Sequence, residues 1–318
     1  MKKELILTLF VASFSLAVFA QQAVQKYDVA TIDSVLAKRE ASVSGIKSGN
    51  EAGIIWANHA NHKKTAIAFV YLHGFGASKR EGGPVMRKLS AKYAANVYEA
   101  RLSEHGIDRV NAYEFLTPEN YIASAKEAVA IGKMLGDHVI VVSTSTGGTL
   151  GLTLAADDHE IAGLVLYSPF IGLINTQIEV VLTPEGKAGF IKMNGSEVTR
   201  QNRPEEEAKF WSTSYHVNGY VALLKMVKTN MVANTFEKVK CPVFVGYYYK
   251  NEQEQDKVVS VPAILKMFSE LGTSNKEKVK LAFSEVGDHV IACDIRSRDW
   301  QSVFDATTLF LDEQFLKK

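Results

Sequence analysis

Short apolar runs and amphipathic stretches alternate along most of the chain. Runs rich in β-branched and aromatic residues, which are typical of buried strands, occupy positions 53–57, 65–72, 96–102, 139–142, 161–167, 242–249 and 278–286. Helical spacing and capping signals predict helices at positions 31–42, 84–94, 117–135, 149–156, 261–271 and 299–315. This alternation predicts an α/β fold, in which a mostly parallel sheet is covered by helices on both faces.

A polar link at positions 58–64 joins the first two predicted strands. Because turn-forming residues between two apolar runs are typical of a hairpin, we expect these strands to pair with each other. His59 and His62 lie in the link, but no third metal ligand stands nearby. A solvated loop is therefore expected there rather than a metal site.

The alternation stops at positions 171–240. We interpret this stretch as a cap, or lid, inserted between two parts of one core, at 21–170 and 241–318. Within it, Asn194-Gly195 predicts a small hairpin. Helices are expected at 204–215 and 217–230. The large aromatic residues of the cap are expected mainly in its own core, with a pocket wall as the alternative: Trp211, Tyr215 and Tyr220.

The N-terminus has the pattern of an export signal. Lys2 and Lys3 precede an apolar run from Leu5 to Ala20, which ends in small residues. This predicts a signal peptide at 1–20, cut after Ala20, and a secreted or periplasmic protein. The run is shorter than the roughly 20 residues of a membrane-spanning helix, so no stable span is expected after cleavage. The formal charge of +1 gives no indication of a nucleic-acid partner, and no oligomeric state is indicated.

The strand at 139–142 runs into a cluster of hydroxyl residues and glycines. Ser145 lies at its centre, with Ser143 and Gly147 two positions to either side. In a strand-turn-helix elbow the residue at the tip takes a strained backbone conformation, and only small residues fit at those two neighbouring positions. The pattern predicts that the Ser145 side chain projects alone from a sharp turn, as a nucleophile would.

A glycine-rich turn, His73-Gly74-Phe75-Gly76, follows the strand at 65–72. Glycines at such a place let the backbone bend so that an amide N–H group faces inward. An oxyanion hole needs such a donor opposite the nucleophile. An ordinary strand-to-helix turn is the alternative interpretation.

A base and an orienting acid for the serine are available after the last two predicted strands. His289 follows the strand at 278–286, and Asp256 lies in the loop after the strand at 242–249. Because the carboxyl ends of parallel strands meet at one edge of the sheet, we expect both to lie beside Ser145. Glu252, in the same loop as Asp256, is the alternative acid.

In these motifs the chain resembles the α/β-hydrolase superfamily, especially its lid-bearing branch of monoacylglycerol lipase-like esterases and serine aminopeptidase-like hydrolases. The resemblance extends from about Ile54 to the C-terminus. Family members usually carry glycine at the positions of Glu104 and Ser143. The segments that carry the resemblance are His73–Gly76, Arg101–Gly106, the Ser145 elbow, Asp256–Val259 and Gly287–His289.

The resemblance implies a role for each of five residues. Ser145 would be the nucleophile, His289 the base and Asp256 the acid that orients it. Backbone N–H groups of Phe75 and Thr146 would be the oxyanion donors. Neither a cofactor nor a metal is implied.

The function expected from this set is that of a secreted serine hydrolase, which cleaves carboxylic esters through an acyl-enzyme intermediate. The substrate would be a small-molecule acyl ester or, in the alternative, a short peptide. A serine aminopeptidase-like peptidase would need an amine-binding carboxylate in the cap, for which Glu205, Glu206 and Glu207 are available. A third hypothesis is a hydrolase-fold binding protein without catalysis, and the complete set of candidate catalytic residues counts against it.

The fold also predicts the state of the two cysteines. Cys241 should lie where its strand begins, at the amino end of the sheet, whereas Cys293 follows His289 near the carboxyl end. Strand residues rise roughly 3.3 Å each, so these levels lie farther apart than the roughly 7 Å between Cα atoms that a disulfide allows. Both thiols are therefore expected to be free.

Overall fold

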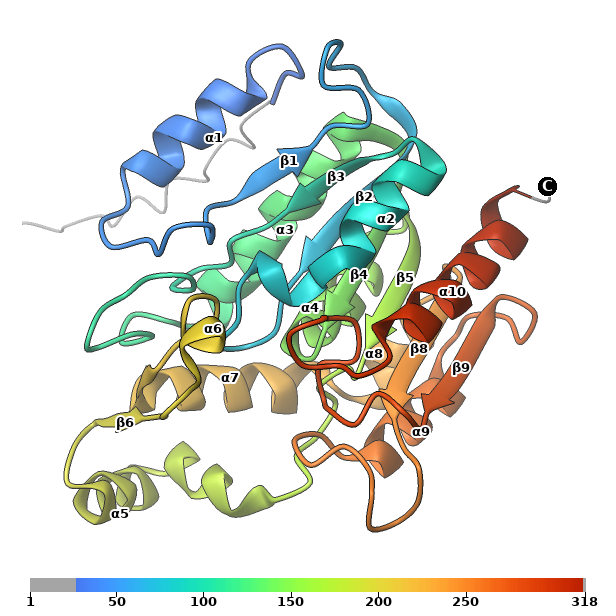
Figure 1. Ribbon diagram of the computed structural model, residues 1–318. Coiled ribbons are helices and arrows are strands. Elements are labelled where there is room, and N and C mark those ends of the chain that lie inside the picture. The colour runs from blue at the N-terminus through green and yellow to red at the C-terminus, as the bar shows by residue number, and fades with distance from the viewer. Residues whose placement is uncertain (1–26, 317–318) are drawn as a thin grey trace, which may run out of the picture.

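The computed structural model describes residues 27–316, so the predicted signal peptide lies outside the described part of the chain. Within that range, the main feature is a seven-stranded sheet with the spatial order β1-β3-β2-β4-β5-β8-β9 (Figure 1). Neighbouring strands are parallel except for β1 and β3, which confirms the predicted mostly parallel sheet. The strands are β1 (Gly53–Ile55), β2 (Thr65–Leu72), β3 (Asn96–Glu99), β4 (Gly136–Thr144), β5 (Ile161–Tyr167), β8 (Val243–Tyr248) and β9 (Lys278–Phe283).

The predicted hairpin between the first two strands is wrong. β1 pairs antiparallel with β3, and Ile54 lies opposite Tyr98. β2 lies on the other side of β3. The link between β1 and β2 is longer than a tight turn, so tertiary packing rather than a local turn chooses the partner strand. His59 and His62 in this link are exposed, as expected.

Helices cover both faces of the sheet (Figure 1). Val70 of β2 faces a core that it shares with buried residues of α3, α4 and α9. Phe69, the preceding residue, faces a second core on the other side of the sheet, which it shares with buried residues of α2 and α10. Side chains of a strand point alternately to the two faces, so β2 is apolar throughout because both faces are covered. The helices outside the segment described next are α1 (Ile32–Ala41), α2 (Gly83–Tyr93), α3 (Pro118–Leu135), α4 (Thr146–Ala155), α9 (Val261–Glu270) and α10 (Trp300–Leu311), with short turns η1 (Lys79–Gly82) and η3 (Asp312–Leu316).

The start of α3 follows directly from local sequence. The Thr117 hydroxyl accepts a hydrogen bond from the Asn120 N–H group (3.2 Å), and the Asn120 side chain accepts one from the Thr117 N–H group (3.0 Å). This reciprocal capping satisfies donors that a helix start leaves free. Pro118 occupies the first turn, where its missing N–H group costs nothing. Both predicted bounds of this helix are confirmed.

Residues 171–240 are here called the β5–β8 segment. Most of the segment lies beyond the carboxyl edge of the sheet (Figure 1), and its last residues, 233–240, return along the core to the start of β8. Its longest helix, α7, packs against α3 and α4 of the core. A two-stranded antiparallel sheet, β6 with β7, lies in the same segment. The elements of the segment are η2 (Thr176–Leu182), α5 (Pro184–Asn194), β6 (Val198–Arg200), α6 (Glu205–Ala208), β7 (Ser214–His216), α7 (Val217–Asn230) and α8 (Ala233–Lys238).

Two predictions for the β5–β8 segment are wrong. Asn194-Gly195 is not a hairpin turn, because Asn194 ends α5 and Gly195 caps it with a φ of 73°. The same dipeptide suits either role, since glycine readily takes the left-handed conformation that both need. The helix predicted at 204–215 is confined to α6, and β7 begins at Ser214. By contrast, the bounds predicted for α7 are confirmed.

Two further findings concern the described part of the chain. Cys241 and Cys293 are both free thiols, as expected. Between residues 27 and 316, we find no helix with the length and apolar character needed to cross a membrane.

Candidate active site

Ser145 occupies the sharp turn between β4 and α4. Its φ of 53° and ψ of −118° are strained values for a residue with a side chain. The Ser145 N–H group donates to the Tyr167 carbonyl oxygen (2.9 Å), which ties the turn to β5. A Cβ atom at Gly147 would lie 1.9 Å from the Leu72 carbonyl oxygen. Glycine is therefore required for α4 to begin this close to β2, as the elbow pattern predicts.

Asp256 and His289 are brought together beyond the ends of β8 and β9. Nδ1 of His289 lies 2.6 Å from Oδ2 of Asp256. The other carboxylate oxygen, Oδ1, accepts hydrogen bonds from the backbone N–H groups of Val258 (2.8 Å) and Val259 (3.0 Å). The Asp256 side chain is fully buried, so its position is fixed on both sides.

The other carboxylates of the same loop are engaged elsewhere. Glu252 and Glu254 are exposed. Glu252 accepts a hydrogen bond from the Tyr249 hydroxyl (2.9 Å), and Glu254 pairs with Lys250 (3.0 Å). The structure therefore brings Asp256, and not the alternative acid Glu252, to His289.

The charges of the Asp256–His289 pair define where the imidazole proton lies. Burial alone would raise the pKa of Asp256, but the charge of His289 and three hydrogen bonds outweigh it and hold this pKa below its usual 3.8. An ionised carboxylate can only accept, so Nδ1 of His289 donates. Nε2 is buried and has no hydrogen-bond partner among residues 27–316. It is therefore the nitrogen available to accept a proton from a nucleophile.

The His289 pKa leads to a prediction about pH dependence. Burial lowers this pKa, but the charge and hydrogen bond of Asp256 raise it more, so it lies above 6.5. A general base must be neutral, and kcat/KM reports the free enzyme. We expect kcat/KM for a non-titrating ester to fall as the pH drops, with its midpoint above 6.5. A midpoint below 6.5 would mean that burial lowers the pKa of His289 more than Asp256 raises it.

The two predicted oxyanion donors lie at the same cavity as Ser145 and His289. Phe75 belongs to the turn after β2, and Thr146 is the first residue of α4. The N-terminus of a helix carries a partial positive charge and free N–H groups, which suits a developing oxyanion. The ring of Phe75 packs against the rings of Tyr113 and Tyr215, with centroids 4.8 and 5.6 Å apart. This packing holds the turn in place from the side.

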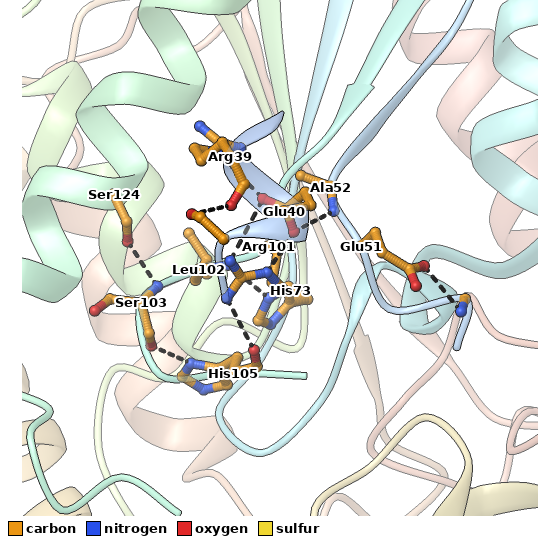
Figure 2. A network of polar contacts seen from close by, with 12 residues as sticks. Arg39, Glu40, Glu51, Ala52, His73, Arg101, Leu102, Ser103, His105 and Ser124 are labelled. Atoms are coloured by element: carbon orange, nitrogen blue, oxygen red, sulfur yellow. Dashed lines mark hydrogen bonds and ion pairs between the residues drawn. The ribbon is translucent and has the colours of Figure 1, made fainter. Parts of the chain in front are cut away.

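His73 joins the turn after β2 to the loop after β3 (Figure 2). Its Nε2 accepts a hydrogen bond from the Leu102 N–H group (3.2 Å), and its Nδ1 donates to the Gly74 carbonyl oxygen (2.9 Å). Complete burial lowers the pKa of His73 to about 4, so the ring is neutral at physiological pH. His73 is therefore a structural residue of the site, which fixes the turn that carries Phe75.

A buried ion pair supports the same region (Figure 2). Nε of Arg101 donates to Oε2 of Glu40 on α1 (2.5 Å), and Nη1 donates to the His105 carbonyl oxygen (3.4 Å). The Ser103 N–H group donates to the Ser124 hydroxyl on α3 (3.1 Å). The loop after β3 is thus held between α1 and α3. No local pattern links Glu40 to Arg101, so sequence reasoning missed this contact.

The two departures from the family pattern are accommodated by the structure. Glu104 has a φ of 66°, a conformation that glycine adopts more readily, and its carboxylate pairs with Arg109. Ser143 is fully buried, and its hydroxyl donates to the Val165 carbonyl oxygen on β5 (3.4 Å). Neither side chain lines the cavity that contains Ser145.

A cavity of about 420 Å³ opens beside Ser145 and His289. The core and the β5–β8 segment both contribute residues to its wall. The wall includes Trp211, Tyr215 and Tyr220, the three aromatic residues expected mainly in the interior of the cap. Trp211 and Tyr215 are also buried. Its apolar wall consists chiefly of Phe170, Leu173, Ile178, Leu223 and Leu224. Its polar wall includes Glu81, Gln201, Arg203, Asp288 and Arg296. Glu81 was not found by sequence reasoning.

Charged residues connect the β5–β8 segment to the loop that carries His289. Arg296 donates from Nη2 to Asp288 (2.9 Å) and from Nη1 to Glu207 (2.7 Å). Arg203 donates to the Tyr215 hydroxyl (3.1 Å). The rim of the cavity is therefore held by pairs of opposite charge. In the described chain, no group of three or more His, Cys, Asp or Glu side chains could hold a metal ion.

This combination of sheet order, elbow and loop positions is that of the α/β-hydrolase fold, and comparisons with solved structures confirm it. One match is titled for LipS and LipT, two metagenome-derived lipolytic enzymes. It has a TM-score of 0.68 and 16% identity, and covers 84% of this chain and 99% of its own.

Two further structures are similar over the same share of the chain. Est1E from Butyrivibrio proteoclasticus, with bound ferulic acid, has a TM-score of 0.59 and 16% identity, and covers 84% of this chain and 96% of its own. A soluble variant of monoglyceride lipase from Saccharomyces cerevisiae, in complex with a substrate analogue, has a TM-score of 0.61 and 14% identity. It covers 84% of this chain and 94% of its own. No family model and no curated protein matches the sequence.

Proposed function

We propose that the protein is a serine hydrolase that cleaves carboxylic esters through an acyl-enzyme intermediate. The observation that carries the proposal is the buried hydrogen bond between Asp256 and His289 (2.6 Å) at a cavity that Ser145 also lines. The partly apolar cavity and the lipolytic structural relatives support an ester as the substrate.

The chemistry follows from the atoms available. Oγ of Ser145 attacks the ester carbonyl carbon while Nε2 of His289 takes the hydroxyl proton. Backbone N–H groups of Phe75 and Thr146 stabilise the oxyanion. The carbon–alkoxy bond then breaks, the imidazolium gives its proton to the departing alcohol, and the acyl group stays on Ser145. Water, deprotonated by His289, releases the carboxylic acid and restores the serine.

The shape of the cavity suggests the size of the substrate. About 420 Å³ lies near the lower end of the range for small-molecule sites. Its apolar wall, with Phe170, Leu223 and Leu224, suits a short or medium acyl chain or an aromatic acyl group. We propose that the β5–β8 segment acts as the lid over this cavity.

A panel of p-nitrophenyl acyl esters of graded chain length tests the proposal. We expect turnover with short and medium chains and a fall in kcat/KM once the chain exceeds the cavity. Amino-acid p-nitroanilides of matched size are the control for a peptidase, and we expect little turnover of them. Preference for the anilides, or no turnover of any ester, would contradict an ester hydrolase.

The carboxylates considered for amine binding do not favour the peptidase. The side chains of Glu205 and Glu206 are 92% and 61% exposed. Glu207 pairs with Arg296. None of the three lines the cavity beside Ser145.

Export is also part of the proposal, since the predicted signal peptide of residues 1–20 supports a secreted or periplasmic enzyme. The mature chain would begin at Gln21. The intact mass of the exported protein tests this directly, because a retained signal peptide would rule out the predicted cut.

A further inference from the structure

Glu81 is a buried carboxylate in the wall of the candidate active site. It lies in η1 and is only 3% exposed. It lines the same cavity as Ser145 and His289, yet the serine mechanism described above does not use it. A buried acid is costly unless hydrogen bonds or an opposite charge compensate it. Its contacts therefore indicate its role.

The first contact is with the turn that carries a predicted oxyanion donor. Oε2 of Glu81 accepts a hydrogen bond from the Gly74 N–H group at 2.6 Å. Gly74 immediately precedes Phe75. A hydrogen bond to an ionised carboxylate is shorter and stronger than one between neutral groups. Glu81 therefore restrains the peptide unit next to the donor.

The second contact leads to the nucleophile elbow. The Tyr71 hydroxyl lies 3.3 Å from Oε2 of Glu81 and 2.9 Å from Oγ1 of Thr144. Thr144 immediately precedes Ser145. The same carboxylate thus connects the turn after β2 with the turn after β4, which are the two loops that would hold the reacting carbonyl group.

The third observation is proximity. A Cβ atom at Gly74 would lie 3.0 Å from Oε1 of Glu81 and 3.1 Å from Cβ of Ser145. The carboxylate and the serine therefore flank the same glycine. Any larger residue at position 74 would push against both.

We propose that Glu81 is a positioning residue of this site, which fixes the Gly74–Phe75 peptide against the nucleophile elbow and adds a second carboxylate near His289. This inference rests on the serine hydrolase proposed above. It predicts two separable effects, one from the hydrogen bond to Gly74 and one from the charge.

The charge effect has a definite sign. Burial raises the pKa of Glu81 to about 7, against the hydrogen bond from Gly74 and the charge of His289, which lower it. A proton on Oε1 leaves Oε2 free to accept from Gly74, so protonation removes the charge but keeps the contact. The ionised form raises the pKa of His289. The titratable groups that interact electrostatically with Glu81 are Tyr71, Tyr121, Tyr215, Asp288, His289 and Cys293.

Glu81→Gln and Glu81→Ala separate the two effects, with Glu99→Gln as the matched control. Glu99 is a half-buried carboxylate whose pKa is also raised, but it ends β3 and does not line the cavity. Glutamine keeps an acceptor for Gly74 without the charge, whereas alanine removes both. Each variant is assayed with p-nitrophenyl butyrate across a pH series.

We expect Glu81→Ala to lower kcat about 100-fold with little change in KM, because small displacements of catalytic groups have effects of this size. Glu81→Gln should recover most of kcat at alkaline pH. Its acid limb should move to lower pH, because loss of the neighbouring negative charge lowers the pKa of His289. Glu99→Gln should leave both kcat and the position of the acid limb unchanged.

Hydrogen–deuterium exchange gives a readout that needs no activity. The peptide containing Gly74 and Phe75 should exchange faster in Glu81→Ala than in Glu81→Gln or the wild type. If the wild type has no esterase activity but Glu81→Ala still exchanges faster than the wild type, the proposed function is rejected and the positioning role is kept. Unchanged exchange would overturn that role. If Glu81→Ala does not fold, an acid limb of Glu81→Gln that coincides with the wild type would overturn the proposal.

Discussion

Replacing Ser145 by alanine is expected to lower kcat for p-nitrophenyl esters on the order of 10⁶-fold, because the nucleophile and the acyl-enzyme are lost together. Folding should be preserved, since alanine keeps the Cβ atom and the backbone hydrogen bond to Tyr167 (2.9 Å). The measurement is a burst and steady-state assay beside a thermal melt. A fluorophosphonate probe should label the wild type at Ser145 and leave the alanine variant unlabelled.

Ser143→Ala is the matched control for this experiment. Its hydroxyl is buried two positions before Ser145 and donates to the Val165 carbonyl oxygen. Loss of one such hydrogen bond costs stability of about 1 kcal/mol but should leave the probe reaction intact. Continued ester turnover by Ser145→Ala would refute the serine assignment.

The second large effect is expected from Asp256→Asn, which should lower kcat about 10⁴-fold. The amide can donate to Nδ1 of His289, which favours the tautomer that carries its proton on Nε2 and cannot act as the base. Size and burial are nearly unchanged, so the melting temperature reports whether folding is affected. The kcat and KM values of purified protein at alkaline pH are the measurement.

Glu252→Gln is the control, because it makes the same chemical change in an exposed side chain of the same loop. The structure pairs Glu252 with the Tyr249 hydroxyl rather than with His289. Its activity should stay within a few-fold of the wild type. A larger loss in Glu252→Gln than in Asp256→Asn would move the orienting role to Glu252.

Elements defined by local signals could be predicted from the sequence, and elements defined by distant contacts could not. The bounds of α7 are confirmed because its apolar face and its length lie within the segment itself. The partner of β1 is β3, to which no turn connects it. In α6 three consecutive glutamates resemble a helix start, and the helix ends after one turn because the chain must reach β7, which pairs with β6.

The same distinction holds for the candidate site. Ser145, Asp256 and His289 each follow a strand, and parallel strands end at one edge, so topology alone brings their loops together. Glu81 stands between Arg80 and Gly82 in a charged turn. Its burial depends on how η1 packs against the Gly74 amide. No periodic pattern in the sequence encodes this contact.

The free cysteines have a practical consequence for labelling. Burial raises the pKa of both Cys241 and Cys293 to about 12. Since the thiolate is the reactive form, we expect neither sulfur to compete for maleimide or iodoacetamide reagents near neutral pH. A single cysteine introduced on the exposed surface of α5 would therefore accept a fluorophore selectively, without first removing the native thiols.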